Sequence, residues 1–597
     1  MDRNSVLRWL AIAGAIFLFW KFGLPLITGD KDKPKPIPGA SETYVNGPGF
    51  VPDVLDPPLK EGEPNKPTEG EADLCKIQGK RFDAELSARG AALTHFYLRD
   101  AQYAGPAGFD LSTTPDQERW RSLRTLFRGA EANDQLKYDR FVWKLERGEG
   151  DKACKFTYED EGLVKIEKTV SAGERPYELV VDTKITNLAS APKRHQLTIS
   201  ASSYHREADV KGSLGRQSPF QTELSCAVAK DVTRKSKDDL KGGTFTAAGT
   251  DRYAAVTSLY FAQALIPVGE GDKPACALSA EGGWMSAGFQ GDDAEATLYQ
   301  ARLAYPPKEL APQATATYKQ IAFFGPKEKD VLKDAGGGGH VGLKDVTNLG
   351  FFTPVARVLI GILDFIHDHI TFGNWGLAII VLTVSIRTIL FPLTFKSIKT
   401  TIAMRRLKPE VDALNAKFAD DAQAKNLAMM ELWKKHGVNP FGGCLPQLVQ
   451  MPVWFAMYTT LQTAVEMYHT KFLWFSDLSQ PDKYFILPLL LGVFMIVQQR
   501  IVPQQGMDPM QQKMMMYMMP AVFTVMMLFL PAALGVYMLT NSLLGIGQQL
   551  AVERFAPSGG KGPPSKAGKE IVVKQVGETR KDSKNSKPPP SEKAARA

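Results

Sequence analysis

The sequence lacks the short motifs by which hydrolases, nucleotide-binding proteins and metalloproteases are recognised. It has no HExxH and no GxSxG, and no GxGxxG follows a strand-like segment. The glycine run GGGGH at 336–340 lacks the Lys-Ser/Thr pair of a phosphate-binding loop. In HDH at 367–369 the histidines are two residues apart, on different faces of a helix, which disfavours a metal site. We therefore expect no catalytic residues, no metal and no cofactor, in a protein that is not an enzyme.

Cysteine is also scarce. No CxxC pair is present, which excludes a zinc ribbon and a thioredoxin-like site. Four of the five cysteines fall in the polar half of the chain, where an oxidising compartment would allow them to pair, but their wide spacing favours isolated thiols. The five are Cys75, Cys154, Cys226, Cys276 and Cys444.

Acidic residues are missing from four apolar runs in the second half of the chain, which are 375–395, 441–465, 484–499 and 514–552. Coupled transporters usually carry an intramembrane acid, so this absence weakens a solute transporter or channel as an alternative. The only charge in the first run is Arg387. A guanidinium at the centre of a bilayer costs roughly 2.5 to 3.5 kcal/mol on insertion scales, so Arg387 must be paired, hydrated or used in function.

The lengths of the apolar runs predict six transmembrane helices. A helix over 375–395 is about 31 Å long, which matches the hydrocarbon core of a bilayer. A helix over 514–552 would be about 58 Å long, so we expect it to break near Pro531 into two spans. Residues 1–30 are predicted to be an uncleaved signal anchor, because Arg3 and Arg8 precede the apolar run and no small-x-small cleavage site follows it.

Loop charges predict the orientation of these helices. The segment from Lys396 to His436 has nine Lys or Arg and five acidic residues, and the tail from Arg554 onward has eleven and four. By the positive-inside rule both segments are cytoplasmic, and so is the N-terminus. Residues 31–372 then lie on the opposite side of the membrane.

The predicted fold class is a polytopic α-helical membrane protein with six transmembrane helices, five of them forming a core, and a large all-β sandwich outside the cytoplasm. Alternating segments such as LVKIEKTV at 163 and HQLTISAS at 195 predict the sandwich. The expected domains are a signal anchor (1–30), a Pro-rich linker (31–72), a β-sandwich (73–330), a hinge with an interfacial amphipathic helix (331–372), a five-helix core (373–550) with a cytoplasmic helical hairpin at 396–437, and a basic disordered tail (551–597).

Several neutral polar residues lie within the apolar runs near Arg387. Hydrogen bonds between helices, each contributing about 0.6 to 2 kcal/mol, would explain most of them. The alternative is that they line a hydrophilic groove with Arg387 at its centre, open to the cytoplasm and to lipid. The candidates for this lining are Thr383, Gln447, Gln450, Tyr537 and Asn541.

Six strings resemble the YidC-type membrane protein insertases, in order and with matching spacing. They are GNWG at 373, Arg387 followed by FPL, MRRLKPE at 404, VNPFGGCLPQLVQMP at 438, DPMQQK at 508 and MPAVFTV at 519. The large β region and the N-terminal anchor resemble the Gram-negative form of this family, whose periplasmic domain is a β-supersandwich. One departure is that Tyr537 is followed by Met538, where bacterial relatives often carry two adjacent tyrosines.

The resemblance implies a multi-pass insertase of the bacterial inner membrane that inserts and helps fold nascent transmembrane segments, alone or with the Sec translocon. Arg387 would be the groove arginine that receives the hydrophilic part of an incoming chain. The helices along which a nascent segment slides would present Met451, Phe455, Met514, Met518, Phe523 and Met526. The cytoplasmic hairpin would present Arg405, Arg406, Lys408 and Pro409.

The partners implied are nascent membrane proteins, the Sec translocon and the phospholipid bilayer. The basic loop and tail add the ribosome as a candidate partner, and DNA is not expected. A second hypothesis is a membrane chaperone or assembly factor, which would hold transmembrane segments without translocating their tails.

Overall fold

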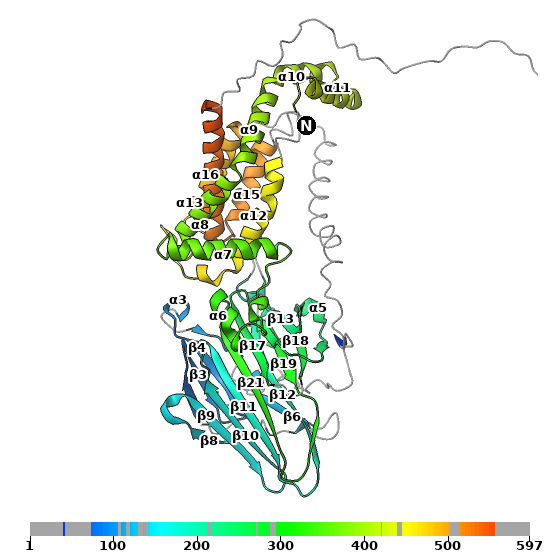
Figure 1. The fold of residues 1–597 in the computed structure, drawn as a ribbon, viewed down its shortest axis with the longest axis vertical. Coiled ribbons are helices and arrows are strands. Elements are labelled where there is room, and N and C mark those ends of the chain that lie inside the picture. Colours follow the sequence, from blue (N-terminus) through cyan, green and yellow to red (C-terminus); the bar gives the residue numbers. More distant parts are fainter. Residues whose placement is uncertain are drawn as a thin grey trace, which may run out of the picture.

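The computed structural model describes two unlike parts, a β domain and a bundle of helices at one end of it (Figure 1). The residues that the structure describes are 40–41, 73–104, 109–114, 120–128, 135–136, 138, 141–211, 218–269, 271, 273–286, 294–418, 421–438, 445–501 and 514–555. The predicted signal anchor, nearly all of the Pro-rich linker and the tail beyond Phe555 lie outside these residues.

The β domain contains three antiparallel sheets. The nine-stranded sheet has the order β14-β13-β16-β17-β21-β11-β10-β9-β8. Its strands are β8 (Lys144–Arg147), β9 (Ala153–Asp160), β10 (Val164–Ala172), β11 (Glu178–Asn187), β13 (Glu223–Val228), β14 (Asp231–Lys235), β16 (Tyr253–Thr257), β17 (Phe261–Val268) and β21 (Thr315–Pro326).

The eight-stranded sheet has the order β1-β15-β18-β19-β12-β6-β7, with β20 beside β12. Its strands are β1 (Ala40–Ser41), β6 (Thr125–Arg128), β7 (Gln135–Leu136), β12 (Lys193–Arg206), β15 (Thr244–Ala247), β18 (Ala275–Met285), β19 (Glu295–Ala304) and β20 (Lys308–Leu310). The four-stranded sheet contains β2 (Leu74–Gln78), β3 (Phe82–Ser87), β4 (Ala92–Leu98) and β5 (Phe109–Asp110). Short helices between strands are α3 (Ala101–Ala104), η4 (Glu149–Asp151), α4 (Glu207–Val210) and α5 (Lys237–Leu240).

Alternation of apolar and polar residues explains why these segments form strands around one core. In β10, Val164, Ile166, Lys168 and Val170 are buried, while Lys165, Glu167 and Thr169 between them are partly exposed. Such alternation places one face of a strand on the core and the other toward solvent. The core joins residues from all three sheets, so the predicted all-β sandwich is confirmed.

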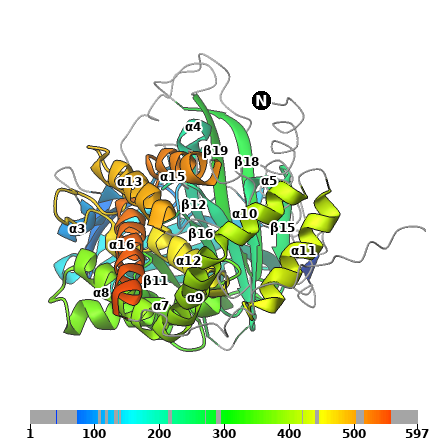
Figure 2. The same cartoon turned by 90° about the horizontal axis from the view of Figure 1, so that it is seen from above.

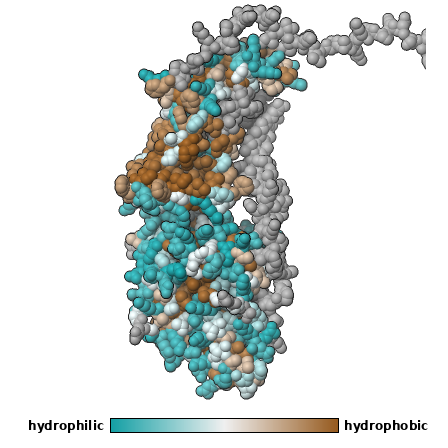
Figure 3. Space-filling view, in the orientation of Figure 1, coloured by the Kyte–Doolittle hydropathy of each residue, from teal (hydrophilic) through white to brown (hydrophobic). Residues whose placement is uncertain are grey.

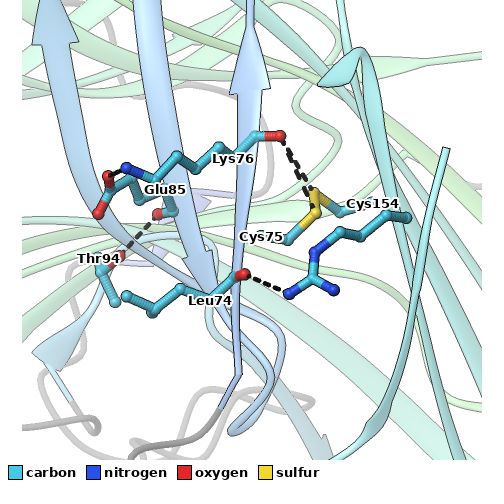
Figure 4. Close-up of a disulfide and its surroundings, with 7 residues drawn as sticks. Leu74, Cys75, Lys76, Glu85, Thr94 and Cys154 are labelled. Atoms are coloured by element: carbon cyan, nitrogen blue, oxygen red, sulfur yellow. Dashed lines mark hydrogen bonds and ion pairs between the residues drawn. A yellow bond between two sulfur atoms is a disulfide. The ribbon is translucent and has the colours of Figure 1, made fainter. Parts of the chain in front are cut away.

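Two disulfides connect the sheets, and the expectation of isolated thiols was wrong. Cys75 of β2 pairs with Cys154 of β9, with 6.2 Å between the Cα atoms (Figure 4). Cys226 of β13 pairs with Cys276 of β18, with a Cα separation of 6.0 Å. Spacing along the chain misled the prediction because the cost of closing a loop grows only slowly with its length, while strand pairing brings distant residues together.

The predicted hinge packs against the β domain. It folds as α6 (Lys329–Asp334), η6 (Ala335–Gly337) and η7 (Leu343–Val346), and Val341, Leu343 and Val346 are at most 1% exposed. The guanidinium of Arg252 donates to the carbonyls of Val341 and Gly342 and to Asp345. Gly342 has φ +57°, and a Cβ there would lie 2.4 Å from this guanidinium. Glycine is therefore required at this close approach, and the segment is a bound connection instead of a free joint.

The second part of the structure is helical. Its elements are α7 (Thr353–His369), α8 (Trp375–Ile389), α9 (Phe391–Arg406), α10 (Lys408–Lys417), α11 (Ala422–Lys435), α12 (Leu445–Thr463), η9 (Val465–Met467), α13 (Ile486–Ile501), η10 (Met514–Met518), α15 (Met519–Met527) and α16 (Ala532–Phe555). Figure 2 shows α16 among α8, α12 and α13, and it contacts all three. The surface of this part is largely apolar, whereas that of the β domain is largely polar (Figure 3).

The helix predicted over 375–395 is broken. α8 ends at Ile389 and α9 starts at Phe391, with a bend of 65° between them. Pro392 explains the break, because proline cannot donate the next helical hydrogen bond and is tolerated in the first turn of a new helix. Among the described residues no single helix is long and apolar enough to cross a membrane, and only this bent pair meets the two criteria together.

The loop between α12 and α13 docks on the β domain. Val465 belongs to the core of the β domain, and the side-chain amide of Gln102 donates to the carbonyls of Glu466 (3.2 Å) and Tyr468 (3.0 Å). The ring of His469 contacts the carbonyl of Gln102 in return (3.0 Å). The helices and the β domain are thus joined at this loop as well as through the chain before α7.

Candidate functional site

Among the described residues, the hydrogen bonds of the Arg387 guanidinium, in the last turn of α8, all go to α16. Its Nε donates to Oδ1 of Asn541 (2.7 Å) and its Nη2 to the main-chain carbonyl of Asn541 (2.9 Å). Nη1 donates to Oε1 of Gln548 (3.4 Å), whose amide donates back to the carbonyl of Arg387 (3.4 Å). Within the part of the chain that the structure describes, no carboxylate pairs with Arg387. The cation is therefore compensated by neutral oxygen dipoles.

A glycine lets the guanidinium approach the backbone of α16. A Cβ on Gly545 would lie 3.3 Å from Nη2 of Arg387 and 3.4 Å from Nε2 of Gln498 in α13. Contacts this short are tighter than ordinary packing, so a side chain at this position would push the guanidinium or Gln498 away. Gly545 thus shapes the polar cluster without donating or accepting through a side chain.

The residues of α16 that form this cluster lie along one face. Tyr537, Asn541, Gly545 and Gln548 are spaced by four, four and three residues, which places them one above another on a helix. The hydroxyl of Tyr537 accepts a hydrogen bond from Nε2 of Gln450 in α12 (3.3 Å). The same face of α16 therefore joins α8 near one end and α12 near the other.

One predicted lining residue, Thr383, does not enter this cluster. Thr383 is 1% exposed, and its hydroxyl donates to the carbonyl of Ile379 in its own helix (2.6 Å). A Thr side chain bonded to the preceding turn has no donor left for a groove, so the structure does not support the lining role predicted for Thr383. Gln447 lies in the first turn of α12, and its side chain is outside the described residues.

The predicted sliding residues lie on two separate helical surfaces. Met451 of α12 and Met518 of η10 are exposed, and Met514, Phe455, Phe523 and Met526 are half-buried. Phe455 stacks on Phe352 with ring centres 5.7 Å apart. α15 packs mainly on α13, whereas α12 packs on α7, α9 and α16. The sliding role remains a prediction, and the exposure of Met451 and Met518 is compatible with it.

Arg405 is not a free basic group of the helical hairpin. Its guanidinium pairs with Glu553 at the end of α16 (3.1 Å) and donates to the carbonyl of Ile501 at the end of α13. Arg406, Lys408 and Pro409 are exposed. Nothing in the sequence indicated the Arg405 contact, because three apolar runs separate Glu553 from it.

Gln548 and Gly545 were missing from the predicted site. Gln548 follows Asn541 by seven residues, or two helical turns, so helical periodicity from Asn541 offered a signal. Gly545 offered none, because its effect depends on how closely α8 approaches.

Comparison with known proteins agrees with this two-part organisation. Residues 74–362 match the family model described as YidC periplasmic domain, and residues 365–558 match the model described as 60Kd inner membrane protein. A curated relative from Anaeromyxobacter dehalogenans (strain 2CP-C), named membrane protein insertase YidC, is 32% identical over 93% of this chain and 98% of its own length. The chain belongs to the YidC family of membrane protein insertases.

A second curated relative supports the same family assignment, and one solved structure can be aligned with the chain. A relative of that name from Geobacter sulfurreducens is 34% identical over 79% of this chain and 85% of its own. A crystal structure titled as an active YidC insertase aligns over 92% of this chain and 99% of its own, with a TM-score of 0.33 and 18% identity. Inner-membrane location and a periplasmic domain follow from membership, and the family is one of insertases and not of catalysts.

Proposed function

We propose that this protein inserts nascent transmembrane segments into the inner membrane through a hydrophilic groove centred on Arg387. The observation that carries the proposal is the state of this arginine, which is half-buried in an apolar helix and whose hydrogen bonds to described residues all go to neutral oxygens. An arriving carboxylate binds such a cation more strongly than an amide does, because it neutralises the charge and can accept two parallel hydrogen bonds from the guanidinium.

In this mechanism Arg387 lowers the barrier for the polar tail that must cross the membrane. The apolar segment behind the tail then partitions into lipid, gaining up to about 0.6 kcal/mol for each Leu-like residue. The tail is released outside once this gain exceeds its attraction to Arg387. No nucleotide is needed, and Met451 and Met518 offer flexible side chains that adapt to many apolar segments.

The proposal includes a topology of six spans with both termini in the cytoplasm. It also retains 31–372 as periplasmic, 396–437 as a cytoplasmic hairpin and the other predicted domain limits. The disulfides of the β domain support its placement in an oxidising compartment. α7 exposes Val358, Ile362 and Phe365 at a spacing of four and three residues, which supports contact with lipid at the periplasmic interface.

Two further partners are proposed, the ribosome from the charge of the hairpin and the Sec translocon from family membership. The exposed Arg406 and Lys408 support contact of the hairpin with the ribosome. Cooperation with the Sec translocon is proposed from family membership alone.

The test is insertion of a single-span substrate with an acidic outer tail into proteoliposomes that contain only this protein. We expect Arg387→Lys to insert the substrate and Arg387→Ala to lose insertion by about tenfold or more, since a hydrogen bond to a charged group contributes roughly 1.5 to 3 kcal/mol. If Arg387→Ala inserts as well as wild type, the charge is not used. The chaperone hypothesis, in which the protein holds segments without translocating tails, would then be preferred.

A further inference from the structure

Asn541 and Gln548 occupy every polar contact that the structure shows for the guanidinium of Arg387. An incoming group that binds Arg387 must therefore compete with these two amides. We propose that Asn541 and Gln548 are specificity-determining residues, which hold Arg387 in a resting state and admit only those tails whose groups bind the guanidinium more strongly than an amide does. This inference rests on the proposed function, because it assumes that the tail meets Arg387.

The relative strengths of the hydrogen bonds to Arg387 support this selection between tails. Asn541 makes two short contacts, one through Oδ1 and one through its main-chain carbonyl, and Gln548 makes a longer third contact. A carboxylate offers two charged oxygens in the geometry that the guanidinium fork prefers, so it displaces the amides, whereas a neutral tail gains nothing over them. The resting cluster thereby favours acidic tails over neutral ones.

The surroundings fix the cluster in place. Gly545 lets the guanidinium reach the main-chain carbonyl of Asn541, and the two amides are two helical turns apart on one rigid helix. Arg387, Asn541 and Gln548 are all partly exposed, so a tail can reach them without prior unfolding of α16. The exchange of an amide for a carboxylate is then a local event between α8 and α16.

Asn541→Asp changes almost only the charge and supplies a permanent carboxylate at the same place. Two single-span substrates that differ only in their outer tails, one rich in Asp and one with Asn at the same positions, are inserted into proteoliposomes of the full chain. We expect Asn541→Asp to lower insertion of the acidic tail about tenfold, the ratio expected when a neutral hydrogen-bond acceptor is replaced by a charged one. A neutral tail does not displace the amides from Arg387 in wild type, so its insertion is already low and it has no contact with Arg387 to lose in Asn541→Asp.

Asn541→Leu removes the side-chain acceptor and is expected to narrow the difference between the two tails, by raising insertion of the neutral one. Thr540→Asp is the matched control, because it adds the same charge at the same depth but about 100° around the helix, and it should leave the ratio between tails unchanged. Gln548→Glu tests the same idea at the second amide if Asn541→Asp fails to fold, as judged by thermal melting of the purified full chain.

The outcomes separate the inference from the function on which it rests. If Arg387→Ala inserts the acidic tail as well as wild type, the proposed function fails and the inference falls with it. If Arg387→Ala fails while Asn541→Asp and Gln548→Glu behave as wild type, the function stands and only the inference is overturned. A loss that is equal for both tails in Asn541→Asp also overturns the inference, because it assigns Asn541 a purely structural role.

Discussion

The two disulfides provide a quantitative test of how the periplasmic domain is held together. Cys75 and Cys154 are 79 residues apart in sequence, and Cys226 and Cys276 are 50 apart. In the chain-entropy model, cross-links that close loops of these lengths stabilise the folded state by about 4.5 and 4.1 kcal/mol at 25 °C, and measured values typically lie at 2 to 4 kcal/mol. Both bonds also join different sheets, so their loss acts on the contacts between sheets.

The perturbation is the double variant Cys75→Ala with Cys154→Ala, which removes one disulfide without leaving an unpaired thiol. We expect the periplasmic domain to lose about 2 to 4 kcal/mol of stability, which lowers its melting temperature by roughly 5 to 15 °C for a domain of this size. Near-UV circular dichroism of the purified full chain follows this transition. The matched variant is Cys226→Ala with Cys276→Ala, which should give a similar but slightly smaller shift.

Reductant supplies the control, because it should lower the melting temperature of wild type but not that of a variant lacking both bonds. Alkylation of the unfolded, unreduced protein should label only Cys444. Labelling of all five cysteines in protein purified from an oxidising compartment, together with a melting temperature that does not respond to reductant, would refute the reasoning.

Other predictions concern buried polar groups of the same domain. Burial lowers the pKa of His195 and of His205 to about 4, from about 6.5 when unfolded, so the unfolded chain binds more protons between these values. The free energy of unfolding therefore falls as pH falls from about 6.5 to 4, by roughly 2 kcal/mol for each histidine at pH 5. Urea unfolding at pH 7.5 and at pH 5 measures this loss, and we expect the difference between the two pH values to be smaller in His205→Asn than in wild type. Lys168 is fully buried and donates to the carbonyls of Ala91 and Leu123 and to the hydroxyl of Thr125. We expect Lys168→Met to lower the free energy of unfolding by about 3 kcal/mol, because these acceptors lose their donor. A melting temperature equal to that of wild type would contradict this prediction.

Local patterns in the sequence predicted much of the fold. Strands with buried residues at every second position, as in β10, need no distant information, because the alternation itself states which face is buried. Pro531 likewise marked the start of α16 at Ala532. The break after Ile389 was also marked, by Pro392, but the apolar composition of the run outweighed this signal in the prediction.

Contacts between residues that are far apart in the sequence could not be predicted from local sequence patterns. The sequence identified Arg387 as a charge that needed compensation, yet its partners lie 154 and 161 residues further on. Thr383, one turn from Arg387, was the nearer candidate, but its hydroxyl is used by its own helix. Arg405 was similarly interpreted as a surface charge of the hairpin, whereas in the structure it forms an ion pair with Glu553. Each case depends on how helices pack, which the order of residues along one helix does not specify.

The way α16 is anchored indicates where a substrate can act. In its first turn the main-chain amides of Ala532 and Ala533 donate to the carbonyls of Gln480 (2.8 Å) and Leu478 (3.0 Å), in the loop before α13. In its last turn Glu553 pairs with Arg405 and accepts from Gln549 (2.7 Å). Backbone bonds and an ion pair thus hold the two ends, while its contact with Arg387 between them depends on neutral amide groups.

This distribution leaves α16 bound to the one arginine of α8 through neutral oxygens, which a carboxylate can replace. An acidic tail that replaces the amides of Asn541 and Gln548 can separate α8 from α16 locally while both ends of α16 stay bound. The periplasmic domain contributes to the same restraint, because the loop between α12 and α13, whose residues 478 and 480 hold the first turn of α16, also docks on it through Val465 and Gln102. We therefore expect an opening at Arg387 to be local, because the loop that holds the first turn of α16 is itself bound to the disulfide-linked periplasmic domain.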